Sequence, residues 1–116
     1  MATFTKLKLS GSTNGRGIAV VSTTAGSGTT IHAAHATALD EIWLYAANID
    51  STARILTVEF GGTTATSDYI QQSIAVTPSG LVLVCAGLIL TGSVTVTAFA
   101  AAASKIELFG FVNRIA

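Results

Sequence analysis

The sequence is short of charged residues. Only 10% of its 116 residues are Asp, Glu, Lys or Arg, and six cations balance six anions, so the formal net charge is zero. A typical soluble domain carries about 25% charged residues. Because a surface with little charge and no net charge tends to associate, we expect much of it to be covered by copies of this chain or by a partner. The alternative is a neutral monomer that Thr, Ser and Ala keep soluble.

Other absences exclude whole classes of function. The six cations form no basic stripe, so we expect no nucleic acid as partner. The most apolar run, residues 81–90, is well short of the ~20 residues of a membrane helix, so we expect no membrane partner and interpret the run as a core strand or strand pair. Met1 to Thr3 lead directly into residues 4–8 without an apolar region, so we expect no signal peptide. The single Cys85 lies in the apolar run and is predicted to be a buried, inert thiol.

The two histidines form no recognisable metal site. His32 and His35 lie three residues apart, so on a strand their side chains project to opposite faces. No cluster of Cys, Asp or Glu lies nearby in sequence to complete a ligand set. We therefore predict no metal and no other cofactor.

The carboxylates and serines form no catalytic signature either. Asp40 and Glu41 are neighbours whose side chains diverge on a strand, so we expect Asp40 in a turn and Glu41 at a rim. A glycosidase pair assembled from Glu59 and Glu107 is conceivable, but nothing in the sequence selects these two. No Gly-x-Ser-x-Gly elbow is present. The sequence therefore predicts a protein that is not an enzyme.

The clearest signal that is present is alternation over residues 40–48, which contain the only Trp. Side chains of a strand point to opposite faces at successive positions, so one face here is aliphatic and the other aromatic and polar. The aliphatic face has Ile42, Leu44 and Ala46, and the other has Glu41, Trp43 and Tyr45. We interpret this stretch as a central strand of an antiparallel sheet.

Similar short stretches recur along the chain, separated by turn signals such as Asn14-Gly15 and the only proline, Pro78. They predict an all-β fold: a single antiparallel β-sandwich domain over residues 1–116, jelly-roll-like, with about eight or nine short strands. The strands at 40–48 and 54–60 are expected to pair as a hairpin. The other expected strands are residues 3–9, 18–22, 30–34, 69–76, 81–90, 94–99 and 105–115.

Trp43 and Tyr45 allow two interpretations. A Trp on a central strand of a sandwich belongs to the core more often than to the surface, so the core is our first expectation. If the two rings are exposed in a groove, they form a platform on which a sugar can stack. A carbohydrate-binding module is therefore the alternative function from these residues.

Several stretches, taken in order and with their spacing, resemble small virion proteins of tailed bacteriophages. The resemblance spans nearly the whole chain and includes no catalytic motif. It implies a capsid decoration or cement protein, made in the bacterial cytoplasm and located on the outside of the head. It also implies a homotrimer that binds the major capsid protein, with a tail or host-attachment component as the alternative. The stretches are residues 4–18, 30–32, 40–48, 58–64 and 109–115.

The resemblance further implies that the N-terminal segment contacts the capsid, by adding a strand to an exposed edge. Lys6 and Lys8 would then meet acidic residues of the capsid. The alternative is that this terminal strand only closes a sheet of its own domain. The residues expected at the capsid or oligomer interface are Ala2, Thr3, Phe4, Thr5, Lys6, Lys8, Arg16 and Arg114.

Overall fold

The structure is a computed structural model that describes residues 3–65, 67–75 and 80–116. This described part contains nine strands and no helix, so the predicted all-β fold is confirmed. It therefore also contains no helix long and apolar enough to cross a membrane. The strands are β1 (Phe4–Lys8), β2 (Ile18–Ala19), β3 (Thr29–Ala33), β4 (Leu39–Asn48), β5 (Arg54–Phe60), β6 (Tyr69–Ile74), β7 (Val82–Leu90), β8 (Thr95–Ala100) and β9 (Ile106–Ile115).

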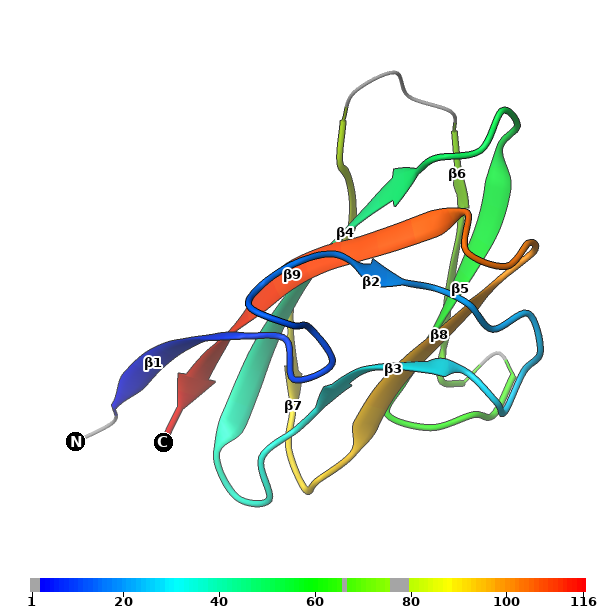
Figure 1. The fold of residues 1–116 in the computed structure, drawn as a ribbon. Helices are drawn as coiled ribbons and strands as arrows, with labels where there is room; N and C mark the ends of the chain where they lie inside the picture. The colour runs from blue at the N-terminus through cyan, green and yellow to red at the C-terminus, as the bar shows by residue number, and fades with distance from the viewer. Residues whose placement is uncertain (1–2, 66, 76–79) are drawn as a thin grey trace.

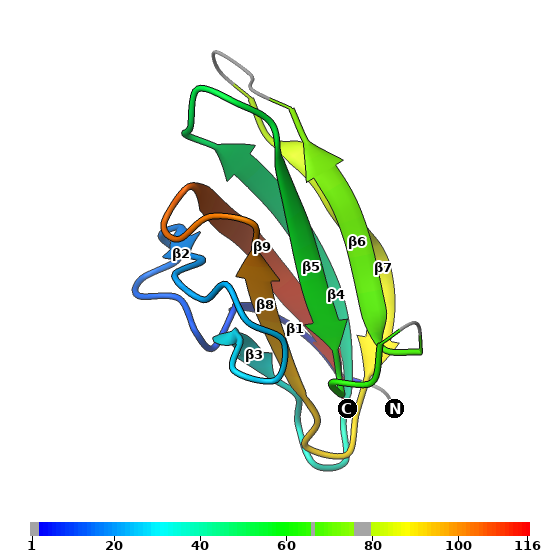
Figure 2. The ribbon, with the colours of Figure 1, turned by 90° about the vertical axis from the view of Figure 1, so that its right-hand side faces the viewer.

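The strands form two antiparallel sheets that pack face to face (Figures 1 and 2). Sheet A has the order β1-β9-β4-β7, with β2 also paired to β9, and sheet B has the order β3-β8-β5-β6. The pairs β2–β9, β3–β8, β4–β7 and β5–β6 are nested, as in one long hairpin that has been rolled up. This is the strand order of a jelly roll, as predicted.

The predicted alternation of β4 is confirmed and places the core. Ile42, Leu44 and Ala46 are fully buried between the sheets, whereas Glu41, Trp43 and Tyr45 are half-buried on the outer face of sheet A. Leu56 and Val58 of β5 meet this core from sheet B. Because β4 pairs with β9 along its whole length and with β7 on its other side, it is a central strand of sheet A.

The predicted hairpin of residues 40–48 and 54–60 is wrong. β4 belongs to sheet A and β5 to sheet B, so residues 49–53 cross from one sheet to the other. Asn48 holds this corner, because its side-chain amide donates to the carbonyl oxygens of Thr52 and Ile74 at 2.9 and 2.8 Å. Alternation specifies which face a strand buries, but it does not specify the neighbouring strand.

Further predictions concern the apolar run and its surroundings. Residues 82–90 form a single strand, β7, at the edge of sheet A, so the alternative of a strand pair is wrong. This strand contributes Cys85 and Leu90 to the core, although most of its residues are partly or fully exposed. Cys85 on this strand is buried as predicted, and burial raises the pKa of its thiol. The break expected at Pro78 lies outside the described residues, as does the last position of the strand expected over residues 69–76.

Glycine is required at one position in the middle of sheet A. Gly110 of β9 pairs with Leu44, and a Cβ atom at Gly110 would lie 2.0 Å from the backbone oxygen of Trp43. Only a residue without a side chain allows β9 to approach β4 this closely. The neighbouring β9 residues Phe109 and Phe111 consequently come to lie beside Tyr45 and Trp43.

Candidate functional site

Four aromatic side chains lie together on the outer face of sheet A, and we call them the aromatic face: Trp43, Tyr45, Phe109 and Phe111. Strand register pairs Trp43 with Phe111 and Tyr45 with Phe109. The Trp43 and Phe111 rings are stacked, with centroids 6.1 Å apart and planes inclined by 9°. All four residues are half-buried. The expectation that Trp43 belongs to the core is wrong, because the inward positions of β4 are its even-numbered residues.

Polar groups fix the aromatic face at one end. Glu41 accepts hydrogen bonds from the indole nitrogen of Trp43 at 2.8 Å and from Asn113 at 3.1 Å. These two hydrogen bonds lower the pKa of the Glu41 carboxyl, and the bond from Trp43 has the larger effect. The Lys6 amino group lies 4.8 Å from the centroid of the Phe111 ring, a cation–π contact. Trp43 therefore has its polar group satisfied within the chain and offers a partner mainly its ring.

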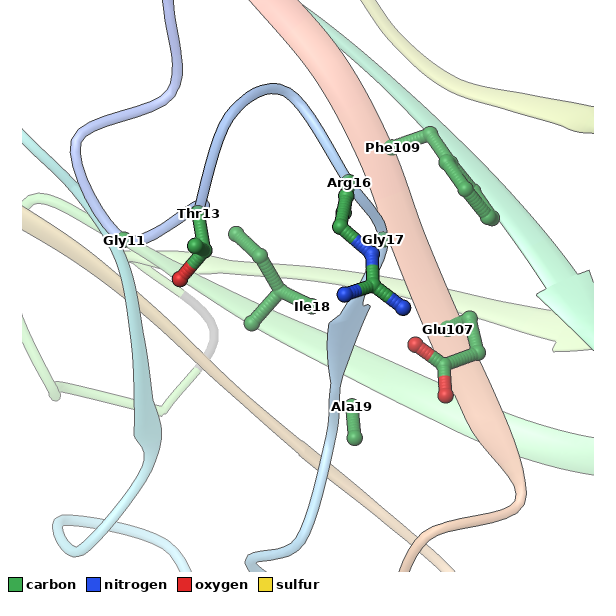
Figure 3. Close-up of a pocket in the computed structure, with 8 residues that line it drawn as sticks. All are labelled: Gly11, Thr13, Arg16, Gly17, Ile18, Ala19, Glu107 and Phe109. Atoms are coloured by element: carbon green, nitrogen blue, oxygen red, sulfur yellow. The ribbon is translucent and has the colours of Figure 1, made fainter.

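A cleft of about 660 Å³ opens where the aromatic face meets the edge of sheet A (Figure 3). It exists because the chain leaves the sheet between β1 and β2. β1 pairs with residues 111–115 of β9 and β2 with residues 107–108, so Phe109 and Gly110 lie between the two paired segments. The loop of residues 9–17 covers this gap. The cleft is lined by Gly11, Thr13, Arg16, Gly17, Ile18, Ala19, Glu107 and Phe109.

Two glycines allow the loop to lie close to both sheets, Gly17 against β9 of sheet A and Gly11 against β3 of sheet B. A Cβ atom at Gly17 would lie 2.7 Å from the Phe109 ring and 3.2 Å from a carboxylate oxygen of Glu107. A Cβ atom at Gly11 would lie 2.4 Å from the carbonyl oxygen of Thr30. Between them, Asn14 and Gly15 both have positive φ angles, 55° and 81°, as the predicted turn requires. The loop therefore has a specific shape that the sequence encodes.

The strand at the other edge of sheet A, β7, is unusually apolar for an edge. Leu81, Leu83, Leu88 and Ile89, on or beside this strand, are between 45% and 54% exposed. No charged residue occurs in the sequence from position 69 to position 104, a segment that includes β6, β7 and β8. Edge strands of soluble proteins usually carry charges or prolines that prevent association. We call this surface the apolar edge.

The structure separates the residues expected at a capsid or oligomer interface into groups. β1 pairs with β9, so this strand does close its own sheet, and its other edge remains open with Phe4 72% exposed. Lys8 donates to the carbonyl oxygen of Ser12 at 2.9 Å. Ala2 lies outside the described residues. The segment 3–8, which contains Thr3, Thr5 and Lys6, therefore forms one continuous edge, whereas Arg16 lies apart from it in the cleft.

Arg114 has a different environment, because it belongs to a buried polar network. Its guanidinium donates to both carboxylate oxygens of Asp40 at 2.7 and 3.0 Å, and His32 Nε2 lies 2.7 Å from the same carboxylate. The backbone amide of Ser10 donates to His32 Nδ1 at 3.1 Å, so His32 Nε2 carries the proton that Asp40 accepts. Asp40 lies within β4 and is completely buried, so the expected turn position is wrong. The network joins β3, β4 and β9; His32 and Asp40 are buried in it, whereas the Arg114 side chain is 27% exposed.

The remaining carboxylates do not assemble a catalytic pair. Glu59 is fully buried in sheet B, where it accepts hydrogen bonds from Gly26 N at 3.0 Å and Thr97 Oγ1 at 2.9 Å. Glu107 lies on the outer face of sheet A, so the two are not brought together. Within the described ranges, no group of three or more His, Cys, Asp or Glu residues is placed to hold a metal ion.

The jelly-roll fold by itself assigns no function, because one fold hosts many. No protein-family model, curated protein or solved structure matches this chain. The aromatic face, the cleft and the apolar edge are therefore the features from which a function can be inferred. The sequence pattern indicated Trp43 and Tyr45 but not Phe109 and Phe111, because only strand register places β9 beside β4. Glu107 was considered only as a partner of Glu59 and not as a residue of the cleft.

Proposed function

We propose that the protein is a structural component of a tailed-bacteriophage virion, a decoration or cement protein. In this role it binds the major capsid protein on the outside of the head as an oligomer, with a homotrimer as the expected state, and stabilises the shell. The observation that carries the proposal is the apolar edge. Four exposed aliphatic side chains on an open, uncharged edge are suited to a lasting contact between proteins.

The resemblance of five sequence stretches to small virion proteins of tailed phages supports the same role. The mechanism is thermodynamic linkage. A protein that binds only the mature shell stabilises it by RT ln(1 + [L]/Kd) per site, and the effect is multiplied over many sites. Such a function needs complementary surfaces and no reacting groups.

The N-terminal strand is the proposed contact with the capsid. Among the described residues no strand pairs with the outer edge of β1, and Phe4 and Lys6 are exposed beside it. Addition of a capsid strand to this edge would use its backbone groups, and Phe4 would supply apolar contact. The apolar edge, on the opposite side of sheet A, remains available for contacts between copies.

Sedimentation with phage heads tests this proposal. Purified protein is mixed with expanded and with unexpanded heads that lack it, and we expect saturable binding to the expanded heads and a higher melting temperature of those heads. Phe4→Ser should weaken binding at least tenfold, because a buried apolar side chain of this size contributes roughly 1.5–3 kcal/mol. Ile55→Ser is the matched control, since Ile55 is 53% exposed on sheet B. A protein that never sediments with expanded heads contradicts the proposal.

A tail or host-attachment protein with affinity for carbohydrate is the second candidate. The half-exposed rings of Trp43 and Tyr45 on the aromatic face favour it. Loss of glycan binding in Trp43→Ala at an unchanged melting temperature would support this candidate. Loss of binding together with a large fall in melting temperature would instead assign Trp43 a structural role.

A further inference from the structure

We propose that the cleft between the 9–17 loop and β9 binds a neutral carbohydrate of one or two sugar units, through Arg16, Glu107 and Phe109. This site is distinct from the Trp43 and Tyr45 platform. The proposal does not rest on the capsid role, because a sugar site is compatible with any location of the protein. The volume of the cleft, about 660 Å³, lies within the range of small-molecule sites.

The polar side chains of the cleft have no partner within the described residues. The Arg16 guanidinium, the Glu107 carboxylate and the Thr13 hydroxyl make no hydrogen bond or ion pair to that part of the chain. Figure 3 shows that the charged ends of Arg16 and Glu107 are directed into the same space. Described buried side-chain nitrogen and oxygen atoms all have a partner, whereas Arg16 and Thr13 are exposed and Glu107 is half-buried, so their polar groups are open to a ligand as well as to solvent.

The charge pattern selects a neutral ligand that is rich in hydroxyl groups. A phosphate or other anion would be attracted by Arg16 but repelled by Glu107, and a cation would meet the reverse situation. A sugar hydroxyl both donates and accepts, so adjacent hydroxyls can donate to the carboxylate and accept from the guanidinium fork. Each such charge-assisted hydrogen bond contributes more than a neutral one.

Phe109 supplies the apolar part of the recognition. Its ring is half-buried, and it lies over Gly17, where a Cβ atom would be only 2.7 Å away. The ring is thus held in place and has a surface toward the cleft, against which the C–H face of a pyranose can pack. The aromatic wall beside donors and acceptors distinguishes this cleft from a purely ionic site.

Titration of the 15N-labelled protein tests the proposal. The probes are D-glucose, D-galactose, L-rhamnose, N-acetyl-D-glucosamine and maltose, with glycine as a zwitterionic comparison. We expect at least one sugar to produce saturable shifts of the amide signals of residues 11–19 and 107–109. Arg16→Ala and Glu107→Gln should each weaken that binding about tenfold, because each removes a charge-assisted hydrogen bond. Phe109→Leu should also weaken it, while the amide spectrum remains that of a folded protein.

Two control variants locate the site. Arg54→Ala removes a half-buried cation that pairs with Asp50, outside the cleft, and Trp43→Ala removes the other platform. Neither should change the affinity of the cleft. The proposal is overturned if no sugar shifts these amides, if glycine binds in their place, or if Arg16→Ala and Glu107→Gln leave the affinity unchanged. A protein that binds heads but no sugar would refute this proposal alone, and the reverse result would refute the capsid role alone.

Discussion

At the scale of single residues, the strongest electrostatic feature is Asp40. Burial alone would raise the pKa of this carboxyl, but the hydrogen bonds from Arg114 and His32 outweigh burial and lower the pKa to about 2. A group whose pKa is lower in the folded state stabilises the fold above its unfolded pKa, near 4, and this contribution is lost as the pH falls toward 2. Asp40 therefore makes folding sensitive to acid.

We predict that the difference in unfolding free energy between the native protein and Asp40→Asn becomes smaller by about 2 kcal/mol between pH 5 and pH 2. The reason is that the native carboxylate becomes protonated over this range, whereas the amide of the variant does not titrate. Urea unfolding at several pH values measures this difference. If it stays constant over the whole range, the hydrogen bonds of Arg114 and His32 do not stabilise the ionised form as described.

The burial of single side chains was predictable from the sequence where strand periodicity determines which face is buried. The inward side of β4 and the buried Cys85 were predicted, because both follow from local pattern and apolar character. The burial of Asp40 was not predicted, because the sequence around Asp40 does not indicate that it pairs with an arginine 74 positions away. Pairings of this kind depend on the fold and have no local signature.

At the scale of strands, β7 is the element whose sequence fits its position least well. As the edge of sheet A it has exposed aliphatic side chains and no charge, although β-bulges interrupt its pairing with β4 next to Ile42 and Leu44. Bulges are one of the devices that protect an edge, and charge is another. The lack of charge is consistent with a strand that is covered by another copy in the assembled protein.

We predict that Leu83→Lys weakens self-association at least tenfold and leaves the melting temperature of the subunit within a few degrees of the native value. Leu83 is 46% exposed, so the substitution costs little in the isolated subunit but places a charge in the proposed contact. Sedimentation velocity measures the association, and Ile55→Lys on sheet B is the control. Equal association of both variants would exclude the apolar edge from the contact.

The positions of the strands in the sequence were largely predictable, whereas the pairing of each strand with its neighbours in a sheet was not. The alternation of apolar and polar residues located β4, β5 and β9, and turn residues marked the ends of the strands, so a jelly-roll-like fold could be predicted from the sequence. The expected hairpin of β4 and β5 failed because residues 49–53 are equally able to connect paired strands or to cross between sheets. The cleft was missed for the same reason, since it depends on the two separate strands that pair with β9.

At the scale of the whole molecule, the shortage of charge and the position of the apolar surface agree. Net charge is zero, and the uncharged segment of residues 69–104 includes the edge strands β6 and β7 of the two sheets. These two strands lie along the same side of the sandwich (Figure 2). A single side that lacks charge is better suited to a contact between copies than a uniformly neutral surface.

The central claim is that the uncharged side of the sandwich is a contact between copies of the chain. Light scattering across a dilution series tests it most directly, because it measures the molar mass of the purified protein in solution. We predict a mass of three chains of 11.8 kDa that persists on dilution and that Leu83→Lys reduces. A mass of one chain at every concentration would contradict the claim, because the uncharged side would then be tolerated in a stable monomer.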